Sequence, residues 1–334
     1  MSIDVQHAEC IRSLVEGTWP QAQIASYEVV QSLWSDYGAI IRGRLEPSGD
    51  KPSSFVAKVV APPTDFQHPR GWNTDASKLR KVRSYQVERT FYERYATQCS
   101  INCAVPKCYG SFNDDGAVTL LLEDLDTEYA VRHSQLRVRE AAVCLRWLAA
   151  FHAKFWGLSD SLLWERGTYW HLETRADEFE VMPSGPLKRA AHKFDAMLNG
   201  CQYSTLLHGD AKVANFCFNP AGDRVAAVDF QYTGFGCGMR DVAYFMGSCL
   251  AEDELCEQEN QLLEVYFQAL TAELAINQPQ VDAQLVETEW RPLYAVCGAD
   301  FHRFLSGWSP GHKKLTAYSE RLVTRALHIA ENHS

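Results

Sequence analysis

The stretch LLHGDAKVANFCF, residues 206–218, sets four polar side chains between two short apolar segments. His208, Asp210, Lys212 and Asn215 supply a proton acceptor, an ammonium group and oxygen ligands. A carboxylate within reach of a hydroxyl can act as a general base. Hard oxygen ligands suit a magnesium ion that is shared with phosphates. The stretch therefore predicts a site for proton transfer or for a metal ion at the end of a buried strand.

A second carboxylate, Asp229, follows the apolar residues 225–228 in VAAVDFQ. The turn NPAGD separates this predicted strand from the one that ends at residue 218. Because strands joined by a hairpin lie side by side, we expect Asn215 and Asp229 to converge on one cation. The alternative for Asp229 alone is a turn or cap residue, which is the more common role of Asp at a strand end.

Lys58 and Glu88 are a second pair of charged residues in apolar surroundings. Lys58 is the only charge in SSFVAKVVAPP, a β-branched run that predicts a strand. Glu88 fills a gap in the apolar stripe of a helix predicted over residues 78–96, and a carboxylate on such a stripe is costly unless paired. We therefore expect an ion pair, with a solvent-facing Glu88 or an outward-facing Lys58 as the alternatives. The stripe consists of Leu79, Val82, Tyr85, Tyr92 and Tyr95.

The elements that must position these residues change in type along the chain. A helix is predicted over residues 8–17, strands within 27–60, a loop over 61–77 and a hairpin within 105–125. From about residue 134 the pattern is mainly helical. The sequence thus predicts an α+β fold with a strand-rich domain over residues 1–123 and a helical domain over 124–334. The two domains are expected to meet near LLLEDLD, with a cleft between them.

The composition is that of a globular protein, with 46% hydrophobic and 22% charged residues among 334. A net charge of -10 argues against a nucleic-acid partner. Nearly all of the acidic excess follows residue 123; it mildly favours a cationic ligand, although a solvated acidic surface is the more common reason. Neither a signal peptide nor a membrane-spanning run is recognisable, so a cytoplasmic protein without a membrane partner is expected.

HGDAKVANFCF followed by VDFQYTGFGCGMRDVAYF resembles the catalytic and metal-binding segments of the aminoglycoside phosphotransferase and choline kinase group in the protein-kinase-like superfamily. LAAFHAKFW and LLLEDL are most similar to its ecdysteroid kinase-like branch. The matching segments follow the family's order over about residues 35–245. The resemblance implies a two-lobed protein-kinase-like fold and an ATP- and Mg²⁺-dependent phosphotransferase that acts on a hydroxyl of a small-molecule acceptor.

The resemblance assigns the central roles residue by residue. Asp210 is implied as the catalytic base. Lys58 is implied to hold the α and β phosphates with Glu88 as its helix partner, and Asn215 and Asp229 to be the magnesium ligands.

Three further residues receive supporting roles from the resemblance. His208 is expected to support the loop, and Asp241 to brace it from outside. Lys212 stands at the position of the lysine in protein-kinase catalytic loops and is expected to neutralise the transferring γ-phosphoryl group. A solvated surface lysine is the alternative for Lys212.

The nucleotide site departs from the family in its phosphate loop. SLWSDYGAIIRG lacks a glycine-dense turn, so the turn from Ser35 to Gly38 is expected to bind the phosphates. The preference for ATP or GTP therefore stays open. Backbone groups near Glu123 and Leu125 are implied to bind adenine. The segment of residues 65–75 is expected to fold over the cleft as a lid.

The acceptor pocket is expected to come from helices after residue 245. Core packing of the aromatic candidates and a simple ion pair between Asp300 and Arg303 remain alternatives. A sterol-like alcohol, an amino alcohol, an aminoglycoside and a sugar are all open as acceptors. The candidate pocket residues are Trp290, Tyr294, Asp300, Arg303 and Trp308.

Two other functions stay open at this point. A protein kinase is disfavoured, because VDFQ is followed by GFGCGMRDVAYF without an activation segment that ends in Ala-Pro-Glu. A nucleotide-binding pseudokinase or regulatory module usually lacks one of the four central positions, and Lys58, Asp210, Asn215 and Asp229 are all present.

Overall fold

The computed structural model describes residues 5–33, 37–47, 51–61, 75–114 and 117–332. The chain forms two compact units. The first comprises Met1–Gln98 and Val105–Glu128, and the second comprises Cys99–Ala104 and Tyr129–Ser334. The first unit is built around a sheet and the second mainly of helices, so the predicted α+β class is confirmed.

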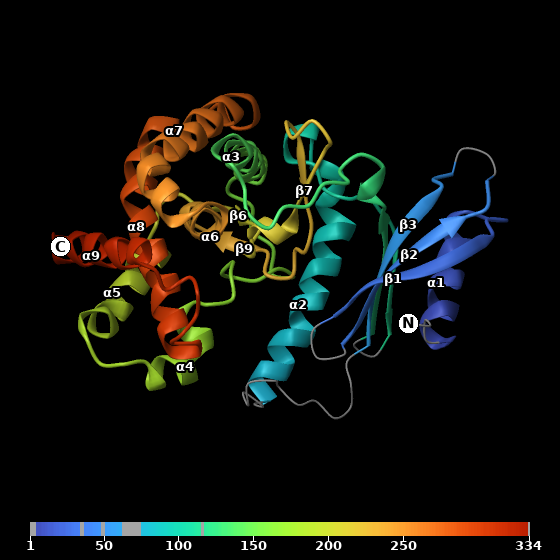
Figure 1. The fold of residues 1–334 in the computed structure, drawn as a ribbon, viewed down its shortest axis with the longest axis horizontal. Coiled ribbons are helices and arrows are strands. Elements are labelled where there is room, and N and C mark those ends of the chain that lie inside the picture. Colours follow the sequence, from blue (N-terminus) through green and yellow to red (C-terminus); the bar gives the residue numbers. More distant parts are fainter. Residues whose placement is uncertain (1–4, 34–36, 48–50, 62–74, 115–116, 333–334) are drawn as a thin grey trace. The chain divides into compact units, whose positions relative to one another are not determined.

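The first unit contains a five-stranded antiparallel sheet in the order β1-β2-β3-β5-β4 (Figure 1). Two helices cover its opposite faces, α1 (Val5–Thr18) and α2 (Asp75–Arg94) (Figure 1). Strands and helices predicted from the β-branched runs and the apolar periodicity are therefore present. The strands are β1 (Ile24–Ser32), β2 (Gly38–Leu45), β3 (Ser54–Val60), β4 (Cys108–Asp114) and β5 (Ala117–Glu123).

Strand β3 shows how the sheet divides its side chains between the two helices. Ala57 and Val59 are buried in a core cluster with Ile11 and Val15 of α1. Lys58 lies between them and faces the other way, because successive side chains of a strand alternate. It meets Glu88 of α2 on that second face.

One part of the helix prediction is wrong: Leu79 is 71% exposed, although it was expected on the buried stripe of α2. Tyr85, Tyr92 and Tyr95 of the same stripe are buried. Apolar spacing shows which residues share a helix face, but it does not show how far along the helix that face is covered.

The second unit packs long helices in pairs. Helix α3 (Val138–Lys154) contacts α7 (Glu252–Asn277), and α8 (Ala283–Trp308) contacts α6 (Met239–Cys249) and α9 (Ala317–Asn332). Two shorter helices, α4 (Ala176–Val181) and α5 (Pro186–Asn199), also pack on α8. In the part of the chain that the structure describes, every helix is too short or too polar to cross a bilayer. The chain also has short 3₁₀ helices: η2 (Ala96–Gln98), η3 (Ile101–Cys103), η4 (Leu125–Thr127), η5 (Leu172–Arg175) and η6 (Val213–Asn215).

Two small ribbons in the second unit frame the stretch that carries the polar residues. Strand β6 (Thr205–Leu207) pairs with β9 (Gly234–Gly236), and β7 (Phe216–Phe218) pairs with β8 (Val225–Ala227). Residues 208–215 run from the end of β6 to the start of β7. The loop is therefore held by a two-stranded ribbon at each end.

Candidate active site

Gly209 makes the sharp turn of the loop possible. Its φ is +82°, and a Cβ atom at this position would lie 1.9 Å from the carbonyl oxygen of Tyr232. Only glycine tolerates both this left-handed backbone and such close contact. The turn brings Asp210 out of line with β6.

Asp241, at the start of α6, braces this turn. Its Oδ2 accepts the backbone N–H of His208 at 2.6 Å, and its Oδ1 accepts that of Gly209 at 2.9 Å. The Nε2 atom of His152 lies 3.2 Å from the same Oδ2, and its Nδ1 lies 2.7 Å from the hydroxyl of Tyr266. The expected contact between Asp241 and the loop is present. It uses both carboxylate oxygens.

His208 holds the loop against the strand that leads to Asp229. Its Nδ1 accepts the backbone N–H of Asp210 at 3.2 Å, so Nε2 carries the proton and donates to the carbonyl of Val228 at 3.0 Å. Burial lowers the pKa of His208 and outweighs the nearby carboxylates. This lowered pKa favours a neutral His208 that ties the loop to residue 228, and its supporting role remains a prediction.

The two carboxylate oxygens of Asp210 are treated differently by their surroundings. Oδ2 accepts the Lys212 Nζ at 2.6 Å and the Asn215 Nδ2 at 3.2 Å. Oδ1 is buried and has no hydrogen-bond partner within 3.5 Å among the described residues. The Tyr244 hydroxyl is close enough to interact with Asp210, and this interaction adds to burial in raising the pKa of Tyr244. Buried polar atoms are almost always paired, so an oxygen without a close donor needs an explanation. One oxygen of Asp210 is thus held by two close donors and the other by none.

Lys212 is a partner of Asp210 in this structure. Burial alone would lower the pKa of Lys212, but the carboxylates of Asp210 and Asp229 outweigh it and raise that pKa. The side chain is 37% exposed, so it stays charged and in contact with solvent. Its expected contact with a γ-phosphoryl group remains a prediction.

Asn215 and Asp229 lie beside neighbouring strands: Asn215 directly precedes β7, and Asp229 follows β8 by two residues. The N–H of Val228 donates to the carbonyl of Asn215 at 3.0 Å, one residue before Asp229. Asp229 has a φ of +73°, and Gln231 Nε2 donates to its Oδ1 at 2.7 Å. A non-glycine residue in this region is strained, and such strain clusters at functional sites.

Lys58 and Glu88 form the buried ion pair that the sequence predicted within the first unit. The Lys58 Nζ lies 2.8 Å from Oε1 and 2.7 Å from Oε2 of Glu88. The two side chains are 8% and 2% exposed. A buried charge pair of this kind fixes the direction of the lysine.

The expected nucleotide contacts in the first unit are described only in part. Ser35 and nearly all of the 65–75 segment lie outside the described residues. Gly38 has a φ of +137°, and a Cβ there would lie 2.0 Å from the carbonyl oxygen of Val59. The Glu123 N–H donates to the carbonyl of Lys107, and the Leu125 carbonyl accepts from Glu128.

The junction LLLEDLD is tied to the sheet by a contact that the sequence did not reveal. Arg42 of β2 pairs with Asp124, its Nε lying 2.9 Å from Oδ2, and also with Asp126. The sequence shows both acidic residues, but it does not show that they pair with Arg42, which lies about eighty residues earlier in the chain.

The five acceptor candidates lie within the helical unit. Trp290 and Tyr294 are completely buried, which core packing requires. The Arg303 Nε lies 2.8 Å from Asp300 Oδ1, and the Arg303 Nη2 donates to the carbonyl of Trp170. Trp308 is partly buried and stacks on Phe304. The structure favours the packing and ion-pair alternatives, and the acceptor role remains a prediction.

Sequence reasoning missed three residues near Asp210. The hydroxyls of Tyr169 and Tyr244 lie 3.1 Å apart, and burial, followed by neighbouring charges that include Asp210, raises the pKa of each. Lys314 follows α8 in a connecting segment, and its Nζ lies 4.3 Å from the Tyr244 ring centre. Tyr244 was visible in GMRDVAYF, but no pattern connects Lys314 with the loop.

Comparison with known proteins finds one matching family and several similar structures. Residues 171–278 match the model of the ecdysteroid kinase-like family. Choline kinase from Cryptosporidium parvum Iowa II has a similar structure, with a TM-score of 0.56, 10% identity, and coverage of 97% of this chain and 96% of that one. No curated protein sequence is significantly similar to the chain.

Two more solved structures are similar over nearly their whole length. An amicoumacin kinase in complex with AMP-PNP, Ca²⁺ and Ami has a TM-score of 0.54, 14% identity, and coverage of 99% of this chain and 94% of its own. A mutant of aminoglycoside phosphotransferase APH(4)-Ia in complex with ADP and hygromycin B has a TM-score of 0.50 and 11% identity. The match covers 97% of this chain and 99% of that one. The fold is protein-kinase-like, and the resemblance stated from the sequence is confirmed.

Proposed function

We propose that the protein is an ATP- and Mg²⁺-dependent phosphotransferase that phosphorylates a hydroxyl group of a small molecule. The observation that carries this proposal is the state of Asp210. One of its oxygens is anchored by Lys212 and Asn215, and the other is buried without a hydrogen-bond partner within 3.5 Å among the described residues. A carboxylate held in this way is ready to orient and deprotonate a hydroxyl.

The proposed reaction transfers one phosphoryl group and one proton. As the acceptor oxygen bonds to the γ-phosphorus, the bond from that phosphorus to its bridging oxygen breaks and ADP leaves. The proton of the hydroxyl passes to Oδ1 of Asp210. Phosphoryl transfer has a loose transition state, so positioning and charge neutralisation matter most. Positioned proton transfer contributes about a hundred- to ten-thousandfold.

Lys58 and Glu88 are assigned to the nucleotide phosphates. Glu88 holds the Lys58 ammonium at 2.8 Å and 2.7 Å, so the cation is oriented before a ligand arrives. Lys212 keeps its charge beside Asp210 and limits the negative charge that an incoming phosphate meets.

Asn215 and Asp229 fit a magnesium ion that is shared with phosphates. They supply hard oxygen atoms from the segments next to the paired strands β7 and β8. Among the described residues no cluster of three His, Cys, Asp or Glu forms a metal site of protein ligands alone. Magnesium commonly takes only one or two carboxylates and completes its shell with water and substrate phosphates. When bound, it supplies charge neutralisation at the transferred group.

The similar structures support a small-molecule kinase. One is named a choline kinase, another an amicoumacin kinase, and a third an aminoglycoside phosphotransferase. Two of them hold AMP-PNP or ADP. These names extend to the present chain as support for the reaction class only.

The test is transfer of radiolabelled γ-phosphate from ATP to a library of alcohols, with the Asp210→Asn protein as blank. We expect a labelled, alcohol-dependent product from the natural protein and at least a hundredfold less from the variant. Equal product from both would remove Asp210 from the chemistry. Nucleotide binding without any labelled product would favour the pseudokinase alternative.

A further inference from the structure

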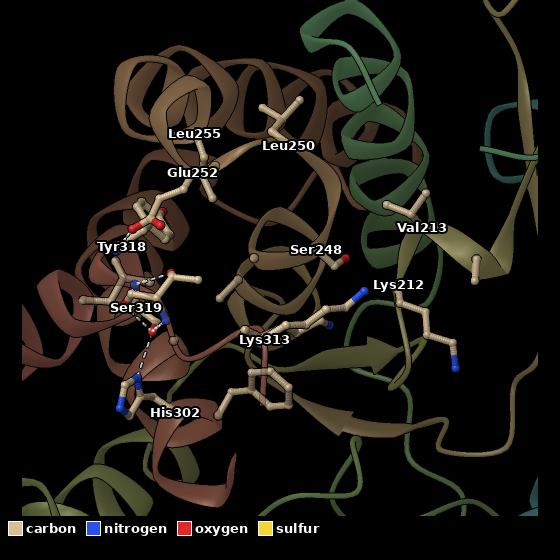
Figure 2. Close-up of a pocket in the computed structure, with 18 of the residues that line it drawn as sticks. Lys212, Val213, Ser248, Leu250, Glu252, Leu255, His302, Lys313, Tyr318 and Ser319 are labelled. Carbon is tan, nitrogen blue, oxygen red and sulfur yellow. Dashed lines mark hydrogen bonds between the residues drawn. The ribbon is translucent and has the colours of Figure 1, made fainter. Parts of the chain in front are cut away.

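A cavity of about 420 Å³ lies in the helical unit beside the catalytic loop. Lys212, Val213 and Ala214 of the loop form one side of it (Figure 2). The rest comes from α6, the start of α7, α8, α9 and the segment between α8 and α9. The cavity therefore touches the segment between Asp210 and Asn215.

The walls of this cavity combine apolar and polar side chains. Leu250, Leu255, Phe301 and Leu322 supply its large apolar surfaces, and the polar lining residues include serines, a threonine and His302. Its acidic lining residue, Glu252, is engaged by the backbone N–H of Tyr318. Figure 2 shows Glu252, Tyr318 and Ser319 grouped at the wall opposite the catalytic loop.

Three lysines line the cavity, and two of them have no carboxylate of their own. Among the described residues, no acidic side chain lies within 4.0 Å of the ammonium of Lys313 or Lys314. Lys313 extends across the cavity toward the segment of Lys212 and Val213 (Figure 2). Lys314 is held over two rings, 4.3 Å from the Tyr244 centre and 5.4 Å from that of Phe301. Asp210 acts on the Lys314 ammonium without an ion pair between them. A cation packed on rings without a carboxylate in contact suits an anionic ligand.

The residues assigned to the nucleotide do not share this cavity. In the described part of the chain, its lining includes neither Lys58 nor the proposed magnesium ligands Asn215 and Asp229. It adjoins the loop on the side of Lys212 and Val213. Asp210 does not line the cavity either, but Lys212, which donates to its Oδ2, does. A ligand in the cavity would therefore lie next to the group that anchors the proposed base.

We propose that this cavity binds the acceptor, and that the acceptor is an alcohol with an apolar body and one anionic group. The apolar body lies against Leu250, Leu255 and Phe301, and the anion lies between Lys313 and Lys314. The inference rests on the proposed function, because it identifies the acceptor of that reaction by its chemistry. It reverses the weak expectation of a cationic ligand that came from the net charge of the second half of the chain.

The test is titration calorimetry with four probes that share one alkyl chain: decanoate, decyl sulfate, decanol and decylamine, each below its micelle concentration. We expect both anions to bind at least tenfold more tightly than decanol, and decylamine to bind most weakly. Lys313→Gln and Lys314→Met should each weaken the anions several-fold and leave decanol unchanged. Lys193→Gln, an exposed lysine on α5, is the matched control and should change nothing.

Failure of this inference is distinguishable from failure of the proposed function, because no catalytic turnover is needed. The inference is overturned if the anions bind no better than decanol or decylamine, or if Lys193→Gln weakens them as much as Lys313→Gln does. It is also overturned if the two cavity variants weaken ATP in place of the anions. In the transfer assay, ω-hydroxydecanoate should then be a better acceptor than its methyl ester.

Discussion

Asp210 owes its proposed role to unequal surroundings on two oxygen atoms of one side chain. The amide of Asn215 and the ammonium of Lys212 hold Oδ2, and this fixes where Oδ1 points. Spacing in the sequence located all three residues within six positions of each other. It did not show that Lys212 would pair with the base itself, because a lysine two residues away can turn to either side of a loop.

At the same scale, Lys314 makes anion binding sensitive to pH. Burial lowers the pKa of Lys314 from 10.5 to about 8, with Lys212 and Lys313 adding to the effect and Asp210 opposing it. Cys249 and Tyr318 nearby have raised pKa values, and burial lowers that of His302, so none of these gains or loses charge between about pH 7 and pH 9. Decanoate should therefore bind about fivefold more weakly at about pH 9 than at pH 7.

The lowered pKa of Lys314 also sets how the stability of the fold changes with pH. Between about pH 8 and 10.5 the unfolded chain binds more protons at Lys314 than the folded one, so stability rises as pH increases through this window. Titration calorimetry at about pH 7 and pH 9 measures how much more weakly decanoate binds at the higher pH. Lys314→Met should lose most of this pH dependence. An unchanged pH dependence in Lys314→Met would mean that another group is responsible.

At the scale of elements, the catalytic loop depends on the way β6 ends. Gly209 turns the chain with a φ of +82° at the point where Asp241 captures two backbone N–H groups. The sequence indicated an irregular turn, because small residues separate the polar ones. It could not indicate that the carbonyl of Tyr232 approaches from the turn before β9, more than twenty residues later in the chain.

Because the Tyr232 carbonyl approaches Gly209 so closely, we expect different results at two glycines that share a left-handed backbone. Gly157 has a φ of +66°, and a Cβ atom there would meet no other atom within 4 Å, whereas at Gly209 the Cβ would meet Tyr232 at 1.9 Å. Gly157→Ala should lower the free energy of unfolding by about 1 kcal/mol. Gly209→Ala should lower it by about 3 kcal/mol or more, and phosphotransfer should be lost.

Urea denaturation of the two glycine variants provides the comparison. Equal losses of stability would show that the backbone angle alone matters and that the close approach to Tyr232 does not. Full activity in Gly209→Ala would show that the loop accepts another turn.

At the scale of the whole molecule, the sequence predicted the fold class and the main elements but not the chemistry of the acceptor. Periodicity and turn residues are local signals, and they located the sheet and the long helices. The exposed Leu79 and the buried Trp290 show the limit of such signals, since burial depends on what packs against a face. Net charge describes the whole chain, whereas the proposed acceptor depends on the few lysines around one cavity.

The two carboxylates of the proposed site have different roles: Asp210 acts on the acceptor, and Asp229 binds the magnesium that holds the nucleotide. Calorimetric titration of a non-hydrolysable ATP analogue, with Mg²⁺ and with EDTA, tests this division most directly. We expect the natural protein and Asp210→Asn to bind the analogue equally and only with Mg²⁺, and Asp229→Ala to lose at least tenfold in that affinity. Tight Mg²⁺-dependent binding by Asp229→Ala, or its loss in Asp210→Asn, would contradict the account.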